Sequence, residues 1–238
     1  MTFNVAALQL ETKRDFTTNL ETAKSLIQKL DCDLLVIPEV FFTDFAYDRF
    51  NYSAEFSTDV LKEIVKLSKN RTICFTLNVK SDGKFYNRGY IVHDQKIIHT
   101  QDKYKLFTLS DEIKQYSPGS KEQIKVVKTK DFTIAMLICF ELRFKELWKA
   151  VEGADIVVIP AKWGALRKKH LEVLAQALAI MNQTFVVVAD SSDCDMAKSS
   201  AIISPFGQFF KDDRQKVIFK KCDLGEVKKM RRYLKVYE

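Results

Sequence analysis

The sequence predicts a layered α/β fold in which two β-sheets are packed between helices. Short apolar runs with strand character alternate with amphipathic helical segments along the whole chain. Two of these runs, at 33–39 and 154–160, reach a proline, which cannot continue a strand ladder. A chain of 238 residues has room for two helix-covered sheets. We therefore expect one domain, 1–238, built as a four-layer α-β-β-α sandwich of two mixed, mostly antiparallel sheets.

The first half of the chain alternates strand and helix signals. A continuous apolar run at 3–10 is typical of a strand buried on both faces, and the run at 33–39 has the same character. Apolar side chains recur at helical spacing at 16–30 and again at 58–70. After these we expect a strand at 71–79, a turn at 81–84 and an antiparallel pair of strands at 85–100.

The second half continues in the same way after an irregular segment at 101–120. That segment is aromatic and charged, and a long loop of this kind inside a compact domain is usually functional or disordered. One helix is expected directly after Cys139, and another at 170–182, where apolar residues share one face. The expected strands lie at 132–138, 154–160, 185–189, 201–203 and 217–223.

The basic character of the chain is concentrated at its C-terminal end. Residues 211–238 contain 10 Lys or Arg and 5 Asp or Glu, so they hold +5 of the net charge of +7. Such a tail can touch nucleic acid or a membrane surface, but no nucleic-acid motif accompanies it. We interpret the part from about residue 224 as a solvated or subunit-contacting extension, and we expect neither a nucleic acid nor a membrane as partner.

Composition argues against several classes of protein. Apolar residues are 47% of the chain and include 18 Phe, which indicates a globular protein. No apolar run approaches the roughly 20 residues that span a bilayer, and the N-terminus lacks the pattern of a signal peptide. We therefore expect a soluble, cytoplasmic protein. The five cysteines form no CxxC pair, which argues against a disulfide framework or a zinc site.

One cysteine occupies a position suited to a nucleophile. In the stretch 131–143, DFTIAMLICFELR, an apolar strand runs into Cys139 and then directly into a polar segment compatible with a helix. The N-terminus of that helix would favour the thiolate, because its free N–H groups and dipole attract negative charge. The other cysteines lack this context; we interpret Cys194 as a loop residue and the remaining three as buried apolar side chains.

Two further reactive residues, Glu39 and Lys103, also lie at or near the ends of apolar elements. A thiol that hydrolyses a carbon–nitrogen bond needs a base that accepts its proton and returns one to the departing amine. Glu39 can do both. The Lys103 ammonium and the backbone N–H of Phe140 can stabilise the oxyanion, and the ammonium would lower the pKa of the thiol. This set of groups requires no histidine.

Several separated blocks of the sequence, in a fixed order, resemble the nitrilase superfamily of carbon–nitrogen hydrolases. The resemblance covers nearly the whole chain. The blocks are VAALQLETKRDFTTNLETA, DLLVIPEVFFTDF, FYNRGYIVHDQKIIHTQDKYKLF, LICFELRF and KSSAIISPFGQ. Each block alone is a weak signal, but their common order and suitable distances make the set specific.

The resemblance implies roles for individual residues. It places the general base on Glu39, the catalytic lysine on Lys103 and the nucleophile on Cys139. A second glutamate of the family matches Glu112, which would hold the lysine and orient the substrate; taken alone, Glu112 reads equally well as a solvated loop carboxylate. Arg143 would structure the cysteine turn by pairing with a carboxylate. No metal or organic cofactor is implied.

Three further residues are candidate substrate contacts. Trp163 follows a strand end that faces the pocket in the family, although it could be plain core. Phe42 belongs to the aromatic cluster beside the glutamate, whose apolar surroundings would raise the pKa of that carboxyl. Lys162, or alternatively Arg143, would supply a cation for a substrate carboxylate.

The segments CFELRF and DE-x-x-x-Y most resemble members that act on ω-amides of dicarboxylic acids. The chain departs from the family pattern at Lys105, in the helix AQALAIMNQ and at 189–193, which leaves the substrate branch open. We favour hydrolysis of a small amide to carboxylate and ammonia, with an N-carbamoyl amino acid hydrolase (β-ureidopropionase-like) as the alternative. An inactive scaffold or nucleic-acid-binding module is the alternative from another class. The family also implies a homodimer or a higher homo-oligomer.

Overall fold

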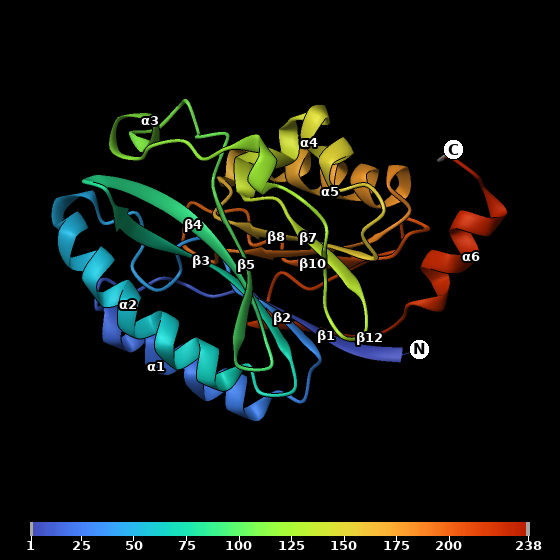
Figure 1. Ribbon diagram of the computed structural model, residues 1–238, viewed down its shortest axis with the longest axis horizontal. Helices are drawn as coiled ribbons and strands as arrows, with labels where there is room; N and C mark the ends of the chain where they lie inside the picture. Colours follow the sequence, from blue (N-terminus) through green and yellow to red (C-terminus); the bar gives the residue numbers. More distant parts are fainter. Residues whose placement is uncertain (1, 237–238) are drawn as a thin grey trace.

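Two six-stranded sheets pack face to face between two layers of helices in the computed structural model, which describes residues 2–236. In Figure 1, α1 (Phe16–Lys29) and α2 (Phe50–Leu67) cover one outer face, while α4 (Lys145–Ala150) and α5 (Lys168–Met181) cover the other. The predicted four-layer α-β-β-α sandwich of mixed sheets is therefore confirmed.

The first sheet has the strand order β12-β1-β2-β3-β4-β5. Its three central strands β1, β2 and β3 are parallel, whereas β4, β5 and β12 run antiparallel to their neighbours. The strands are β1 (Thr2–Leu8), β2 (Leu34–Val36), β3 (Thr72–Ser81), β4 (Lys84–His93), β5 (Lys96–Asp102) and β12 (Val217–Asp223).

The second sheet, of order β11-β10-β9-β8-β7-β6, repeats this pattern. Its strands β7, β8 and β9 are parallel, and the other three are antiparallel to their neighbours. The succession β7-α4-β8-α5-β9-β10-β11 thus matches β1-α1-β2-α2-β3-β4-β5. The strands are β6 (Val127–Lys128), β7 (Thr133–Met136), β8 (Ile156–Ala161), β9 (Phe185–Asp190), β10 (Ala201–Ile203) and β11 (Phe209–Lys211).

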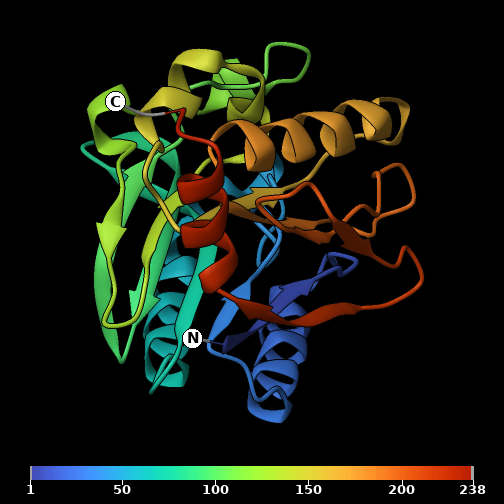
Figure 2. The same cartoon turned by 90° about the vertical axis from the view of Figure 1, so that its right-hand side faces the viewer.

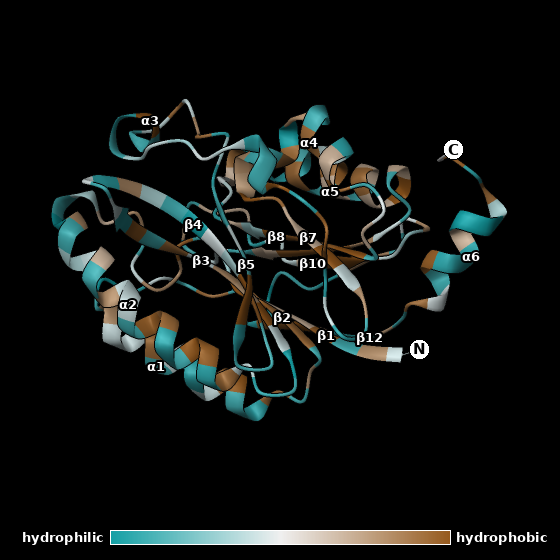
Figure 3. Ribbon diagram, viewed as in Figure 1, coloured by the Kyte–Doolittle hydropathy of each residue, from teal (hydrophilic) through white to brown (hydrophobic). Residues whose placement is uncertain are grey.

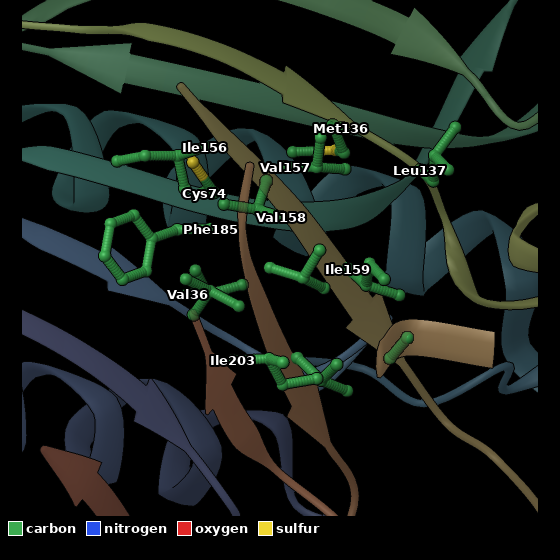
Figure 4. Packing of buried hydrophobic residues seen from close by; sticks show 14 of the residues in the cluster. Val36, Cys74, Met136, Leu137, Ile156, Val157, Val158, Ile159, Phe185 and Ile203 are labelled. Atoms are coloured by element: carbon green, nitrogen blue, oxygen red, sulfur yellow. The ribbon is translucent and has the colours of Figure 1, made fainter. Parts of the chain in front are cut away.

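The apolar core lies in two layers, because the central strands are buried on both faces. In β1, Val5 and Ala7 belong to the core between the sheets, whereas Ala6 and Leu8 face α1 and α2. Figure 4 shows the layer between the sheets, where Val36 of β2 lies close to strands of the second sheet. Figure 3 shows hydrophobic strands in the middle and mixed polarity on the outer helices.

Helix α2 begins at Phe50, eight residues before the predicted start at 58. The buried positions of its first two turns are Phe50, Ser53 and Ser57, so two serines interrupt the apolar periodicity that sequence reasoning relies on. Ser53 is satisfied inside the protein: its hydroxyl donates to the Phe50 carbonyl at 2.9 Å and accepts from Asn78 Nδ2 at 3.2 Å.

The basic C-terminal segment is in large part a helix, α6 (Gly225–Tyr233), that packs on the sandwich. Val227 is completely buried and Met230 nearly so. Arg231 Nη2 donates to the Ala154 carbonyl at 2.7 Å, and Gln183 Nε2 donates to the Leu234 carbonyl at 2.6 Å. Figure 2 shows α6 crossing in front of the layers. The expected extension is thus docked through one apolar face, and residues 237–238 lie outside the described residues.

Two absences are relevant to function. Among residues 2–236, no helix is both long and apolar enough to cross a membrane. Within the same range, no group of three His, Cys, Asp or Glu side chains is arranged to hold a metal ion.

The docking of α6 can be tested by shortening one side chain. Replacing the buried Val227 by Ala should lower the free energy of unfolding by about 2 kcal/mol, because it removes apolar contacts and leaves a cavity. Lys228→Ala, at the exposed neighbouring position, should change it by no more than about 0.5 kcal/mol. Urea denaturation measures both values, and equal effects of the two variants would contradict the docked helix.

Candidate active site

Cys139 lies at a sharp turn three residues after the end of β7. Its backbone is left-handed, with φ of 46°, a conformation that costs a non-glycine residue about 1–3 kcal/mol and must be held by its surroundings. The next residues form a 3₁₀ turn, η3 (Cys139–Arg143), before the short helix α4. The Cys139 side chain thereby reaches the wall of a cavity.

Glu141 holds this turn in place. Its fully buried carboxylate accepts the backbone N–H of Ile138 at 2.7 Å and that of Tyr104 at 2.7 Å. These two bonds tie the residue before Cys139 to the residue after Lys103, so the two segments cannot shift independently. Burial raises the pKa of Glu141 to about 7, although the two N–H donors oppose the shift.

Glu39 lies at a second sharp turn, where the ends of the two sheets meet. β2 leads through Pro38 to Glu39, whose N–H donates to the carbonyl of Ala161 in the other sheet at 3.3 Å. Val40 is then left-handed, with φ of 43°, and its N–H donates to the buried Thr76 hydroxyl at 2.7 Å. The carboxylate is thus delivered from the centre of the first sheet toward the second.

Lys103 follows β5 and is enclosed by two carboxylates. Its Nζ donates to Glu39 Oε1 at 2.7 Å and to the two oxygens of Glu112 at 2.7 and 3.0 Å. All three side chains are 1% exposed. Glu112 comes from the short helix α3 (Glu112–Gln115) and also accepts the Phe107 N–H at 2.5 Å. The alternative interpretation of Glu112 as a solvated loop carboxylate is therefore wrong, since the irregular segment folds inward and brings this side chain onto Lys103.

Asn87 on β4 completes this network, although no sequence pattern singles it out. Its Nδ2 donates to Glu39 Oε1 at 2.8 Å, and its carbonyl accepts the Lys103 N–H at 2.8 Å. The Asn87 Oδ1 atom is buried and has no hydrogen-bond partner among residues 2–236. Asn87 belongs to the block that begins FYNRG, one of those that resemble the family. A single asparagine within a strand pattern, however, does not by itself indicate a functional role.

Burial and pairing together determine the charges at this site. Burial raises the pKa of Glu39, although the Lys103 charge opposes the shift. Burial would lower the pKa of Lys103, but the charges of Glu112 and Glu39 outweigh it and raise that pKa well above its usual value. The lysine is therefore an ammonium, and Glu39 binds a proton more readily than an exposed glutamate.

The pKa of the Cys139 thiol is raised well above its usual range. Burial is the main cause and the Glu39 carboxylate adds to it, while Lys103 and the backbone N–H of Lys162 act in the opposite direction. The predicted direction of the Lys103 effect is confirmed, but burial outweighs it, so the pKa of the thiol is raised and not lowered. The Lys103 charge is already compensated by two glutamates, and Cys139 itself is buried at the start of a 3₁₀ turn.

These groups lie on the wall of one cavity of about 220 Å³. Glu39, Lys103, Glu112 and Cys139 all contribute to it, so the structure brings the four residues together from four separate elements. The wall also contains five aromatic residues, Phe45, Tyr47, Phe107, Phe140 and Trp163. Such a cavity suits a small ligand with one polar, reactive end.

Arg143 and Trp163 also face this cavity, in contact with each other. The Arg143 guanidinium carbon lies 4.9 Å from the centroid of the Trp163 ring, and Arg143 Nη2 lies 3.1 Å from His170 Nδ1. The predicted pairing of Arg143 with a carboxylate is wrong within the described residues, because Glu141 is engaged by backbone N–H groups instead.

Lys162 lines the cavity but is already neutralised. Its Nζ forms ion pairs of 2.6 Å with Asp44 and 2.6 Å with Asp193, and its side chain is 9% exposed. It is therefore poorly suited to serve as a free cation for a substrate carboxylate. Asp44 follows β2 of the first sheet, and Asp193 follows β9 of the second. The two ion pairs of Lys162 therefore join the loops that border the cavity.

Phe42 does not line the cavity. It is fully buried in the layer beneath α1 and α2, where its ring packs against Phe41 and Phe75 at centroid distances of 5.5 and 6.1 Å. The left-handed residues Val40 and Asp44 redirect the chain, so that Phe45 reaches the cavity wall instead. The prediction of a substrate contact at Phe42 is therefore not supported by the structure.

The segment 189–193, where the sequence departs from the family pattern, positions the part of the cavity wall that contains Trp163. Asp190 is fully buried and accepts the N–H of Trp163 at 2.9 Å and that of Ser199 at 3.1 Å. Burial raises the pKa of Asp190 to about 7, although these N–H donors oppose the shift. Sequence reasoning assigned no role to this aspartate, because its partners are separated from it along the chain.

Comparison with known proteins agrees with this geometry. The family model described as carbon–nitrogen hydrolase matches residues 4–232. The chain is 28% identical to "2-oxoglutaramate amidase" of Bacillus subtilis (strain 168), over 92% of this chain and 90% of that protein. It is also 28% identical to "Omega-amidase YafV" of Escherichia coli (strain K12), over 74% of this chain and 70% of that protein.

Comparison with solved structures shows a shared fold. A crystal structure of a carbon–nitrogen hydrolase superfamily protein from Xanthomonas campestris superposes with a TM-score of 0.87 and 20% identity, covering 98% of this chain and 95% of that one. Together with the family match over nearly the full length, these similarities show that the chain belongs to the carbon–nitrogen hydrolases of the nitrilase superfamily.

Proposed function

We propose that this chain hydrolyses small amides to a carboxylate and ammonia through a thioester on Cys139, and that ω-amides of dicarboxylic acids are its preferred substrates. The observation that supports the reaction most directly is the buried Lys103 ammonium between Glu39 and Glu112, on the wall of the cavity that also holds the thiol. The printed names of the two relatives support the substrate class.

In the first half of the reaction, Cys139 Sγ attacks the amide carbon while its proton passes to Glu39. Proton transfer and attack must be coupled, because the raised pKa of the thiol keeps it protonated until substrate is present. An ammonium has three donors, and the longest of the three Lys103 contacts, at 3.0 Å to the second oxygen of Glu112, is the one that the oxyanion would replace. The Phe140 backbone N–H is the second proposed donor.

Collapse of the tetrahedral intermediate breaks the carbon–nitrogen bond. Glu39 returns the proton to the leaving nitrogen, ammonia departs and a thioester remains on Cys139. Glu39 then takes a proton from water, whose oxygen attacks the thioester carbon. The carboxylic acid leaves and the thiol regains its proton. Glu112 and Asn87 touch neither the thiol nor the reacting atoms in this scheme; they position Lys103 and Glu39.

The test of this function is ammonia release from a panel of substrates. Succinamate and glutaramate should be hydrolysed, and Cys139→Ala should reduce turnover by at least about 10³-fold because the thioester cannot form. Cys194→Ala, which removes an exposed thiol, should leave it unchanged. Release of ammonia from N-carbamoyl-β-alanine but not from the amides would favour the alternative branch. No turnover of any compound would overturn the proposal.

The role of Glu39 predicts a particular dependence on pH. A general base must be deprotonated, so kcat/KM should fall as the pH is lowered through the pKa of Glu39, which burial raises above the ordinary 4.5. Glu39→Gln should lower kcat/KM by about 10²- to 10⁴-fold and remove this acidic limb. Glu152→Gln, at an exposed position, is the control. An acidic limb that persists in Glu39→Gln would assign it to another group.

We also propose that the chain forms at least a dimer, as family resemblance implies. Helix α5 exposes apolar side chains at Val173, 47% exposed, and Ile180, 42% exposed, and Phe206 on the turn between β10 and β11 is 41% exposed. Light scattering at micromolar concentration should give at least twice the 27.5 kDa of one chain, and Ile180→Asp should reduce it. A wild-type mass of one chain would contradict the dimer.

A further inference from the structure

Four cationic side chains line the cavity, and they differ in whether a carboxylate neutralises them. Lys103 is paired with two glutamates and Lys162 with two aspartates. Arg143 and Arg167 form no ion pair with any carboxylate between residues 2 and 236. The two guanidinium groups are therefore the uncompensated positive charges of the cavity wall.

Arg167 is positioned by its neighbours so that it borders the cavity. It ends the 3₁₀ turn η4 (Ala165–Arg167), and its carbonyl accepts the Trp163 Nε1 proton at 2.9 Å. Its guanidinium carbon lies 5.2 Å from the centroid of the Phe107 ring. A Cβ atom on Gly164 would lie only 2.9 Å from Arg167 Nη2. The absence of a side chain at Gly164 therefore leaves the space that the guanidinium uses.

The two arginines lie close enough to influence each other. Burial and then the charge of Arg167 lower the pKa of Arg143. Two like charges facing one small cavity repel each other, and an anion bound between them would relieve that repulsion. Helix α5 begins at Lys168, directly after Arg167, so the positive end of its dipole lies at the same rim.

We propose that Arg167 is a specificity-determining residue: together with Arg143 it binds the carboxylate at the non-reacting end of the substrate and rejects amides that carry an ammonium group beside that carboxylate. This inference rests on the proposed amidase function. Planar guanidinium groups match a carboxylate in shape and can donate two parallel hydrogen bonds. An ammonium beside that carboxylate would lie near two positive charges that no carboxylate of residues 2–236 neutralises.

Three amides that differ in one group test this selection. Succinamate has the carboxylate, L-asparagine adds an α-ammonium, and butyramide replaces the carboxylate by a methyl group. In Arg167→Gln, kcat/KM for succinamate should fall about 10- to 100-fold, mainly through KM, as expected for loss of a charge-assisted contact. Turnover of butyramide should stay within about 2-fold, and the preference for succinamate over L-asparagine should shrink.

Two further variants separate charge from structure. Arg167→Lys keeps the charge but loses the planar fork, so it should recover part of the activity on succinamate. Lys169→Gln removes the same charge from an exposed position two residues further on, and it should change none of the three activities. Equal losses on succinamate and butyramide in Arg167→Gln would mean that Arg167 only supports the fold of the wall, and would overturn the inference.

Calorimetry with succinate provides a readout that needs no turnover. Wild-type protein should bind succinate more tightly than Arg167→Gln by a factor similar to the change in KM, and butyrate should show a smaller difference. Failure of the amidase proposal would appear as the absence of ammonia release from every amide by the wild-type protein. Failure of the present inference would appear as equal affinity of both proteins for succinate.

Discussion

A lysine ammonium buried between two carboxylates is the constraint on which the arrangement of this protein depends. Removing such a charge from water costs several kcal/mol, and only close, well-oriented partners offset that cost. Glu39 comes from the end of β2, Lys103 from the end of β5 and Glu112 from α3, so three distant segments must meet within hydrogen-bond distance. The hydrogen bonds of Asn87, Glu141 and Thr76 to neighbouring backbone or side-chain groups hold those segments in position.

Much of the fold was accessible from the sequence, because strands buried on both faces leave continuous apolar runs and outer helices leave periodic ones. The start of α2 was missed because serines occupy its buried face. The meeting of Glu39, Lys103, Glu112 and Cys139 was predicted only through the order of the family blocks. The partners Asn87, Asp190 and Arg167 were not found, since which polar side chains converge depends on turns such as the left-handed Val40 and Asp44, which no periodicity reveals.

The cationic side chains of the cavity wall are of two kinds: the lysines are paired with carboxylates, and the arginines are available to a ligand. The network around Lys103 and the ion pairs of Lys162 are closed, because every cation there has carboxylate partners. The thiol is kept neutral mainly by its own burial. A protonated, enclosed thiol reacts slowly with oxidants and alkylating agents, since the thiolate is the reactive form. Reactivity in the proposed mechanism is therefore tied to the presence of substrate.

The repeated order of strands and helices in the two sheets has a consequence for how the site is assembled. The segments β1 to β5 and β7 to β11 are two copies of one supersecondary arrangement, and their parallel strands end at a common seam. Glu39 and Lys103 come from the first copy, whereas Cys139 and Trp163 come from the second. Neither half alone holds all of these groups, so the complete site exists only where the two sheets pack against each other.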